Sequence, residues 1–308
     1  MKFWSISAGA LLGLCGAQPA LAAECASVTF SPGTVTLPSY DPIAGGAVQS
    51  SFTATINRVK PSTASVRLIF NDISYATPVK FHSDLAGGGP FYQILDSGGI
   101  NVAFPRNVNV KTTTNPLIPT PSGPPGDSVS VSYLVNALAN SDGRDLRNGA
   151  YGTNLSYSIE CFDGGNSYFG SDLVVPGPSL AVTIPNLVSL TTASPQTLDF
   201  ENFTTLTQQL NVGLKSTGPI NVDLRTDNGR RLVRLGSPNP APKNSYIAYS
   251  IRLNGRAVTS DPYILTNAPR AGVGGTQWPL QLILAAQPSG KLAGTYADMI
   301  TLTLTPGS

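Results

Sequence analysis

Apolar and polar residues alternate with a period of two along many short stretches of this chain. The alternation is found at residues 51–56, 129–135, 155–159, 210–214, 220–224 and 300–304. Val, Ile, Thr and Tyr predominate in these stretches, and turn dipeptides such as Asn228-Gly229 and Asn254-Gly255 punctuate the chain between them. This pattern predicts half-buried antiparallel strands, and no window has convincing helical periodicity. We therefore expect an all-β protein built from β-sandwiches.

The chain is long enough for two such domains, and its two halves look related. Residues 146–151 and 292–296 each end in Tyr and lead into an alternating strand, which indicates a domain duplication with a period of about 145 residues. The segment 174–178 reads Val-Val-Pro-Gly-Pro and is predicted to be a linker, because proline and glycine disfavour strand pairing. The expected domains are residues 24–178 and 179–308.

The first 23 residues have the features of a signal peptide. An apolar run from Ile6 to Ala17 is too short to span a membrane, and the small-x-small motif 20–22 predicts cleavage after Ala22 or Ala23. Lipid attachment at Cys15 is the alternative, and Leu14 disfavours it. No later stretch is apolar for long enough to form an integral membrane segment, so we expect export through the periplasm.

Charged residues make up only 12% of the chain, about half the usual share. Nucleic acid is not an expected partner, because phosphate binding requires clustered Lys and Arg. The expected N-terminal domain has eleven acidic and eight basic residues, and the C-terminal one has six acidic and ten basic residues. Arg230, Arg231 and Arg234 crowd one turn, which is either a solvated turn or a docking surface for another subunit.

Two cysteines remain after the predicted cleavage, Cys25 and Cys161. In an exported chain an even pair indicates one disulfide, although two free buried thiols are the alternative. The bridge would tie the start of the N-terminal domain to its last strands and stabilise it by roughly 4 kcal/mol through the entropy of the unfolded chain.

Residues with catalytic potential are few, and we expect no enzyme, no metal and no cofactor. His82 is the only histidine, and no nucleophile motif accompanies it. A glycosidase would need a carboxylate pair, for which loop aspartates are available, but such residues beside glycine are more often turn formers. These aspartates are Asp142, Asp145, Asp163 and Asp172. The run 87–89 is not between a strand and a helix, so it is not a phosphate-binding loop.

Several short motifs in the C-terminal half are shared with a known family. They are Leu198-Asp199-Phe200, Asp227-Asn228-Gly229, the stretch 247–255, and Gly294-Thr295-Tyr296 with Asp298 before the alternating strand 299–305. On these residues the half resembles the spore coat protein U domain of subunits in archaic (Csu-type) chaperone–usher pili. Residues 37–42 look like an early stretch of the same domain, with Leu37 and Pro38 departing from its pattern.

The resemblance implies two immunoglobulin-like β-sandwich domains, of which the C-terminal one lacks its last strand. A periplasmic chaperone first fills the gap, and the N-terminal extension of an adjacent pilin subunit later replaces it as the donor strand. The inner wall of this acceptor groove would be Ile300, Leu302 and Leu304. An ordinary core strand is the alternative. Because Cys25 closely follows the predicted cut, we also expect a subunit that accepts a strand but donates none.

Two domains with one acceptor groove resemble the tip adhesin of such pili, assembled by an outer-membrane usher and displayed on the cell surface. The expected function is attachment to an abiotic or host surface and biofilm formation through loops of the N-terminal domain. Apolar residues among loop-forming ones mark the candidate contacts, unless they cover the core of their own domain. They are Leu117, Ile118, Tyr168, Phe169, Phe91 and Tyr92. The alternative function is a secreted carbohydrate- or matrix-binding protein outside any fibre.

Overall fold

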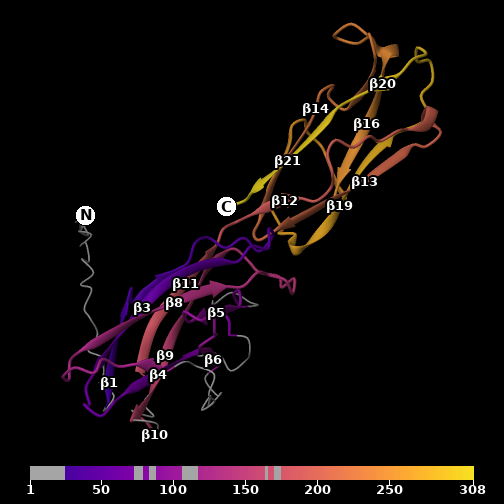
Figure 1. The fold of residues 1–308 in the computed structure, drawn as a ribbon. Helices are drawn as coiled ribbons and strands as arrows, with labels where there is room; N and C mark the ends of the chain where they lie inside the picture. Colours follow the sequence, from indigo (N-terminus) through magenta and orange to yellow (C-terminus); the bar gives the residue numbers. More distant parts are fainter. Residues whose placement is uncertain (1–24, 73–78, 83–87, 106–116, 164–165, 170–174) are drawn as a thin grey trace, which may run out of the picture.

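The computed structural model describes residues 25–72, 79–82, 88–105, 117–163, 166–169 and 175–308. The predicted signal peptide therefore lies outside the described residues. The described chain is almost entirely β, as predicted, with only two short 3-10 helices, η1 (Glu201–Phe203) and η2 (Lys243–Ser245). No helix in this part of the chain is long and apolar enough to cross a membrane. Two sandwiches lie end to end (Figure 1).

The first sandwich packs two sheets around one core. The smaller sheet has the strand order β1-β3-β8-β5. The larger has the order β2-β11-β9-β4-β6, with β10 paired to β9 and β7 to β4. The bounds are β1 Ala26–Ser31, β2 Thr34–Thr36, β3 Val48–Arg58, β4 Ser65–Asp72, β5 Tyr92–Leu95, β6 Ala103–Pro105, β7 Ile118–Pro119, β8 Ser128–Ala137, β9 Gly149–Asp163, β10 Asn166–Phe169 and β11 Val175–Ile184. Alternate residues of β3, β4 and β9 are buried, as the period of two predicts.

Strand β11 closes the first sandwich and moves the domain boundary. It pairs antiparallel with β9 and parallel with β2, and it runs to Ile184. The boundary expected at residue 178 therefore falls inside a strand. The pairing shifts register between Pro176 and Ser179, so the prolines are accommodated at a bulge instead of ending the strand. The first sandwich ends at Ile184, and the connection to the second is residues 185–187.

The second sandwich also has two sheets, with the orders β12-β13-β19-β16-β15-β20 and β18-β14-β21, and β17 paired to β16. The bounds are β12 Val188–Leu190, β13 Thr207–Ser216, β14 Ile220–Thr226, β15 Arg231–Arg234, β16 Tyr246–Leu253, β17 Arg256–Ala257, β18 Tyr263–Ala268, β19 Gly272–Leu284, β20 Tyr296–Ala297 and β21 Ile300–Pro306. Its core is a separate cluster of buried residues that includes Leu214, Val222 and Ile251.

The two sandwiches follow the same plan with one strand of difference. The run β1-β3-β8-β5 corresponds to β12-β13-β19-β16, and the pair β9-β4 corresponds to β21-β14. In the first sandwich β11 lies against the other side of β9. Among the described residues no strand pairs with the other side of β21, which pairs with β14 alone.

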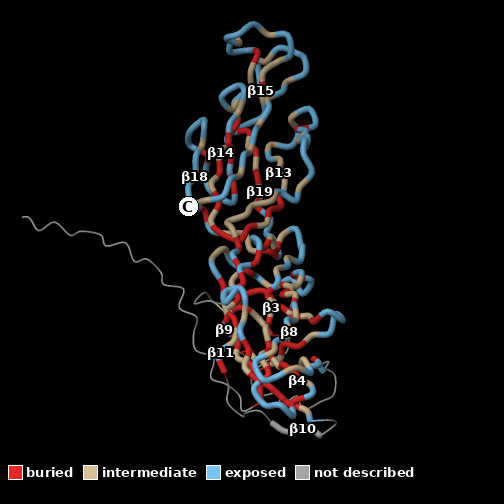
Figure 2. The backbone as a smooth tube through the Cα atoms, turned by 60° about the vertical axis from the view of Figure 1, so that its left-hand side comes forward, coloured by how far each residue is buried: buried red, intermediate tan, exposed pale blue. Residues whose placement is uncertain are grey.

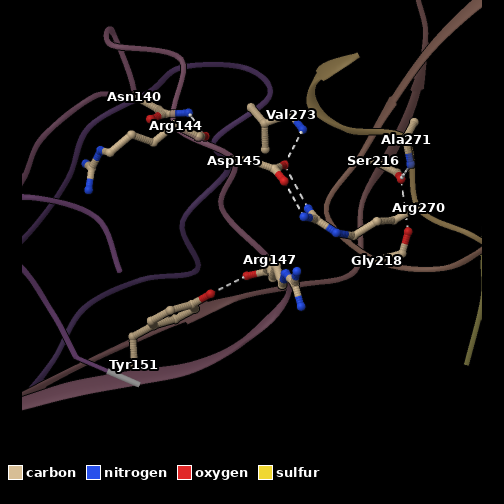
Figure 3. A network of polar contacts seen from close by, with 10 residues as sticks. All are labelled: Asn140, Arg144, Asp145, Arg147, Tyr151, Ser216, Gly218, Arg270, Ala271 and Val273. Atoms are coloured by element: carbon tan, nitrogen blue, oxygen red, sulfur yellow. Dashed lines mark hydrogen bonds and ion pairs between the residues drawn. The ribbon is translucent and has the colours of Figure 1, made fainter. Parts of the chain in front are cut away.

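Polar contacts fix the joint between the sandwiches (Figure 3). Both carboxylate oxygens of Asp145 accept hydrogen bonds from the Arg270 guanidinium, and one also accepts from the Val273 backbone N–H. Arg270 holds the pKa of Asp145 below its usual value. The Val273 side chain packs into the core of the first sandwich, although Val273 belongs to the second. The hydroxyl of Thr217 donates to the Pro185 carbonyl and accepts from the Leu187 N–H. The connection is therefore held along its length.

Candidate functional site

Strand β21 is half-buried along its inner face. Ile300, Leu302 and Leu304 are partly exposed and pack against the second core, while the threonines between them are exposed. Since β21 pairs only with β14, the backbone groups on its other side are not paired with any strand of the described chain. We call this side of β21, with the half-buried apolar residues beside it, the open edge. It contains the three residues predicted to line an acceptor groove.

Residues from the facing sheet share the same half-buried state. Strand β12 pairs only with the end of β13, between Leu214 and Ser216, so the start of β13 has β19 on one side and no strand on the other within the described chain. Partly buried residues from this region pack against the second core: Val188, Leu198, Phe203, Leu206 and Leu210. Strands β12 and β21 lie near each other, and the partly buried side chains of both sheets pack against the same second core.

The open edge is bounded at both ends. At the end away from the first sandwich, the rings of Phe203 and Tyr296 meet edge to face with their centroids 6.1 Å apart. At the joint, the Asn186 side-chain amide donates to the Gly307 carbonyl over 2.6 Å, and the Gly307 N–H donates to Pro219. The open edge therefore extends along the length of β21.

The turn η1, next to the Phe203–Tyr296 contact, has an unusual backbone. Glu201, Asn202 and Phe203 have φ angles of 45°, 57° and 64°, in the left-handed region. For residues with a Cβ this conformation costs roughly 1–2 kcal/mol each and is normally adopted by single residues. The strain is located where the open edge ends.

The family-like motifs of the C-terminal half meet at one carboxylate. Asp298, just before β21, accepts hydrogen bonds from the Tyr249 hydroxyl at 2.6 Å and from the Asn228 backbone and side chain at 3.1 Å. Burial raises the pKa of Asp298, and burial also raises the pKa of Tyr249. Asp298 thus ties the 227–229 turn and β16 to the start of β21, which fixes the position of the open edge.

The end of the first sandwich farthest from the joint carries the confirmed disulfide between Cys25 and Cys161, whose Cα atoms are 6.5 Å apart. We call this region the distal end; it comprises residues 59–64 and 117–127 with β10 (Figure 1). Leu117, one of the predicted contact residues, is 45% exposed there, and Val59 is 43% exposed. Val59 was not predicted as a contact residue, because it is a single apolar residue between the end of β3 and the turn at residues 60–62.

Two of the six predicted contact residues are buried instead. The Ile118 side chain lies in the first core because β7 pairs with β4, where Ile118 is opposite Val66. Tyr92 is fully buried, and its hydroxyl donates to the carboxylate of Asp72. Neither side chain is available for contact with a surface, so for both the expectation of exposure was wrong.

The other three predicted contact residues are placed differently. Phe91 is half-buried, and the guanidinium of Arg144 lies 3.5 Å from its ring centroid. Tyr168 and Phe169 are in a strand rather than a loop, with their backbones opposite Cys161 and Glu160. Their side chains lie outside what the structure describes.

The only histidine joins a buried polar cluster. His82 Nε2 lies 3.1 Å from Oδ1 of Asp72, and Tyr92 and Thr153 donate to Oδ2 of the same carboxylate. All three side chains converge on Asp72, an arrangement that stabilises a buried charge by hydrogen bonding. Among the described residues no group of three or more His, Cys, Asp or Glu side chains is arranged to hold a metal ion.

Two of the four aspartates considered for a glycosidase carboxylate pair form ion pairs with arginines. Asp142 forms an ion pair with Arg144, and Asp145 is the acceptor at the joint. Asp163 lies opposite Asn166 in the β9–β10 pairing, and Asp172 lies outside the described residues.

No family model matches this chain, and no curated protein matches it either. Solved structures, however, do match it. The chaperone–tip adhesion subunit pre-assembly complex CsuC–CsuE of archaic Csu pili from Acinetobacter baumannii is similar over 88% of this chain and 96% of that chain, at 15% identity and a TM-score of 0.39. The CupB6 tip adhesin from Pseudomonas aeruginosa is similar over 91% and 94%, at 13% identity and a TM-score of 0.38. Similarity at this level carries no conclusion about the partners or activity of this chain.

Proposed function

We propose that this chain is an adhesive subunit of a chaperone–usher fibre, exported through the periplasm and carried at the fibre tip. The second sandwich accepts a β-strand from a partner, first from a periplasmic chaperone and then from the adjacent pilin that the usher adds. The first sandwich contacts an abiotic or host surface and promotes biofilm formation. The observation that carries the proposal is the open edge at β21, where the first sandwich has β11.

Two physical arguments support a β-strand as the partner of the open edge. An unpaired strand edge with apolar side chains is prone to pair with another chain. A strand placed there would satisfy the free backbone groups of β21 and would cover Ile300, Leu302 and Leu304. Full burial of such side chains is worth roughly 1.5–3 kcal/mol each. The first sandwich indicates the direction that such a strand would take, since β11 runs antiparallel to β9.

The test is to extend the chain beyond Ser308 with a tight turn and a ten-residue strand that copies β11. Because β21 ends at the joint, a strand that folds back from residue 308 runs antiparallel to it, as β11 does to β9. We expect the free energy of unfolding of the second sandwich to rise by roughly 3 kcal/mol. The matched control carries serine at the copied positions of Leu180, Val182 and Ile184.

If the free energy of unfolding of the second sandwich is the same in the extended protein and in its serine control, the strand-acceptor proposal is rejected. It would favour the alternative, a secreted carbohydrate- or matrix-binding protein that is complete without a partner. In that case the unextended chain would also remain a folded monomer at high concentration in the absence of any chaperone.

The adhesive part is tested at the distal end. Val59→Ser with Leu117→Ser removes the two large exposed apolar side chains found among the described side chains of that end, and we expect attachment to fall at unchanged surface display. Ile264→Ser is the matched control, because Ile264 is 60% exposed on β18 of the second sandwich. Unchanged attachment with the double variant would show that contact is made elsewhere.

A further inference from the structure

The second sandwich has a basic end, opposite the joint. Strands β15 and β20 and the helix η2 lie there, with exposed loops beyond them (Figures 1 and 2). Arg231 and Lys291 both lie over the ring of Tyr246, at 4.7 Å and 5.2 Å from its centroid. The Lys291 ammonium donates to the backbone carbonyl of Lys243 at 2.8 Å. Arg234 donates to the Ala293 carbonyl over the same distance.

The side chains of Arg231, Arg234, Lys243 and Lys291 take part in none of the ion pairs found within the described residues. Like charges gathered on one surface repel each other, and that repulsion is relieved when an acidic surface docks. Arg230, by contrast, is turned away and donates to the Val258 carbonyl. The crowded arginines of the sequence therefore separate into one structural residue and two that belong to the basic end.

Two large apolar residues are exposed among the cations. Leu235 is 64% exposed and Leu292 is 43% exposed. The loops that carry them are held together, because the Leu235 N–H donates to Thr295 and the Tyr296 hydroxyl donates to the Leu292 carbonyl. Apolar side chains ringed by charges are typical of protein–protein contacts, in which a core of apolar contact has a polar rim.

The direction of β21 links this end to the strand acceptor. Strand β21 begins beside β20 at the basic end and finishes at the joint. A strand that runs antiparallel to it, as β11 does to β9, leaves the open edge at the basic end. If that strand is an N-terminal extension, the folded body of the partner follows it and lies against this end.

We propose that the basic end binds the folded body of the strand-supplying subunit, through a surface on which acidic side chains surround an apolar contact. This inference rests on the proposed function, because it assumes that a partner supplies the strand. The surface comprises Arg231, Arg234, Lys243, Lys291, Leu235 and Leu292. It adds a second contact to strand exchange and selects partners by charge.

The test uses synthetic peptides and the full chain. Each peptide has the same ten-residue strand of alternating Val and Thr, followed at its C-terminus by four Glu or four Ser residues. A third peptide carries the four Glu residues at its N-terminus, which would lie at the joint. We expect the C-terminal Glu tail to lower the Kd about fivefold relative to the Ser tail, with the gain lost at high salt.

Two double variants identify the surface. Lys243→Glu with Lys291→Glu should abolish the gain from the C-terminal Glu tail. Arg252→Glu with Arg256→Glu makes the same change in charge toward the joint end of the second sandwich and should preserve the gain. The assignment of the basic end is overturned if Glu residues at the N-terminus of the peptide lower the Kd as much as those at its C-terminus. It is also overturned if the Kd is still lowered in the Lys243→Glu, Lys291→Glu variant.

The two proposals fail separately. If no strand peptide binds at any concentration tested, the strand-acceptor function is wrong and the basic end loses its partner. If the Ser-tailed peptide binds and the C-terminal Glu tail brings no gain, the acceptor stands and the basic end is not an acidic-partner surface.

Discussion

The first sandwich closes its core with its own last strand, and the second does not. In the first, β11 covers the side of β9 that would otherwise be open, and its inward residues Leu180, Val182 and Ile184 are all buried. In the second, the equivalent side of β21 is uncovered, and its inner residues are half-exposed. Backbone strain follows the same division. Every non-glycine residue with positive φ in the described chain belongs to the second sandwich.

This difference separates two steps: the packing of two sheets, and the covering of their core by a last strand. Both halves contain enough alternating strands to form two packed sheets, but one strand decides whether the inner rows are fully removed from water. The closed half has strands paired on both sides of β9, and within the described residues the open half has one side of β21 unpaired. Duplication of one sandwich plan can thus produce two parts with different needs for a partner.

The largest expected effect concerns the closed half alone. Replacement of Cys25 and Cys161 by serine removes a cross-link between residues 136 positions apart, and we expect the first sandwich to lose roughly 4–5 kcal/mol of stability. The second sandwich should unfold as before. Denaturant titrations followed by a fluorescent label on each sandwich would measure this. Equal destabilisation of both halves would mean that the two are one cooperative unit.

A pair of alanine substitutions compares the two inner rows directly. Leu180→Ala in β11 should cost about 3 kcal/mol, because it leaves a cavity in a closed core. Leu302→Ala in β21 should cost only about 1 kcal/mol in the isolated chain, because that side chain is already half-exposed. In the chain extended by a complementing strand, the cost of Leu302→Ala should approach that of Leu180→Ala. Similar costs in the unextended protein would contradict the comparison.

Relief of strain at the open half should have a smaller and opposite effect. Glu201 is exposed and has a φ of 45°, which glycine adopts without a Cβ clash. We expect Glu201→Gly to stabilise the second sandwich by about 0.5–1 kcal/mol, and Glu201→Ala to bring no such gain. Thermal unfolding of the two variants would distinguish these results. A loss of stability with Glu201→Gly would show that the Glu201 side chain contributes more than its backbone strain costs.

The smallest expected effect is at the joint, where the two halves meet. The pKa of Asp145 is lowered from 3.8 by its hydrogen bonds with Arg270. Because folding lowers the pKa of Asp145, its ionised carboxylate stabilises the folded joint at pH values above 3.8, the pKa in the unfolded chain. This contribution is lost as the pH falls below 3.8 toward the lower pKa of the folded state. Energy transfer between a dye on each sandwich should therefore show a looser joint at pH 3 than at pH 6. Asp145→Asn should be equally loose at both, and a joint that responds to pH in this variant too would exclude Asp145 as the cause.

The strands and the cross-link were predictable from local patterns, whereas burial at single loop positions was not. Alternation identified β3, β8, β9 and β21, and the cysteine count identified the disulfide. The expected linker was wrong because Pro176 and Pro178 lie within β11, and Ile118, expected in a loop, pairs with β4. Tyr92 was misplaced because its partner, Asp72, is twenty residues away in the sequence. Contacts of that kind depend on register, which alternation does not specify.

The short connection between the sandwiches has a mechanical consequence. Tension applied to the second sandwich passes through residues 185–187 directly into the end of β11. The hydrogen bonds of β11 with β9 on one side and β2 on the other lie across the direction of pull, so they are loaded together in shear rather than peeled one after another. The contacts of Thr217 with Pro185 and Leu187 carry the load first. The strand that closes the first sandwich is therefore also its anchor against force.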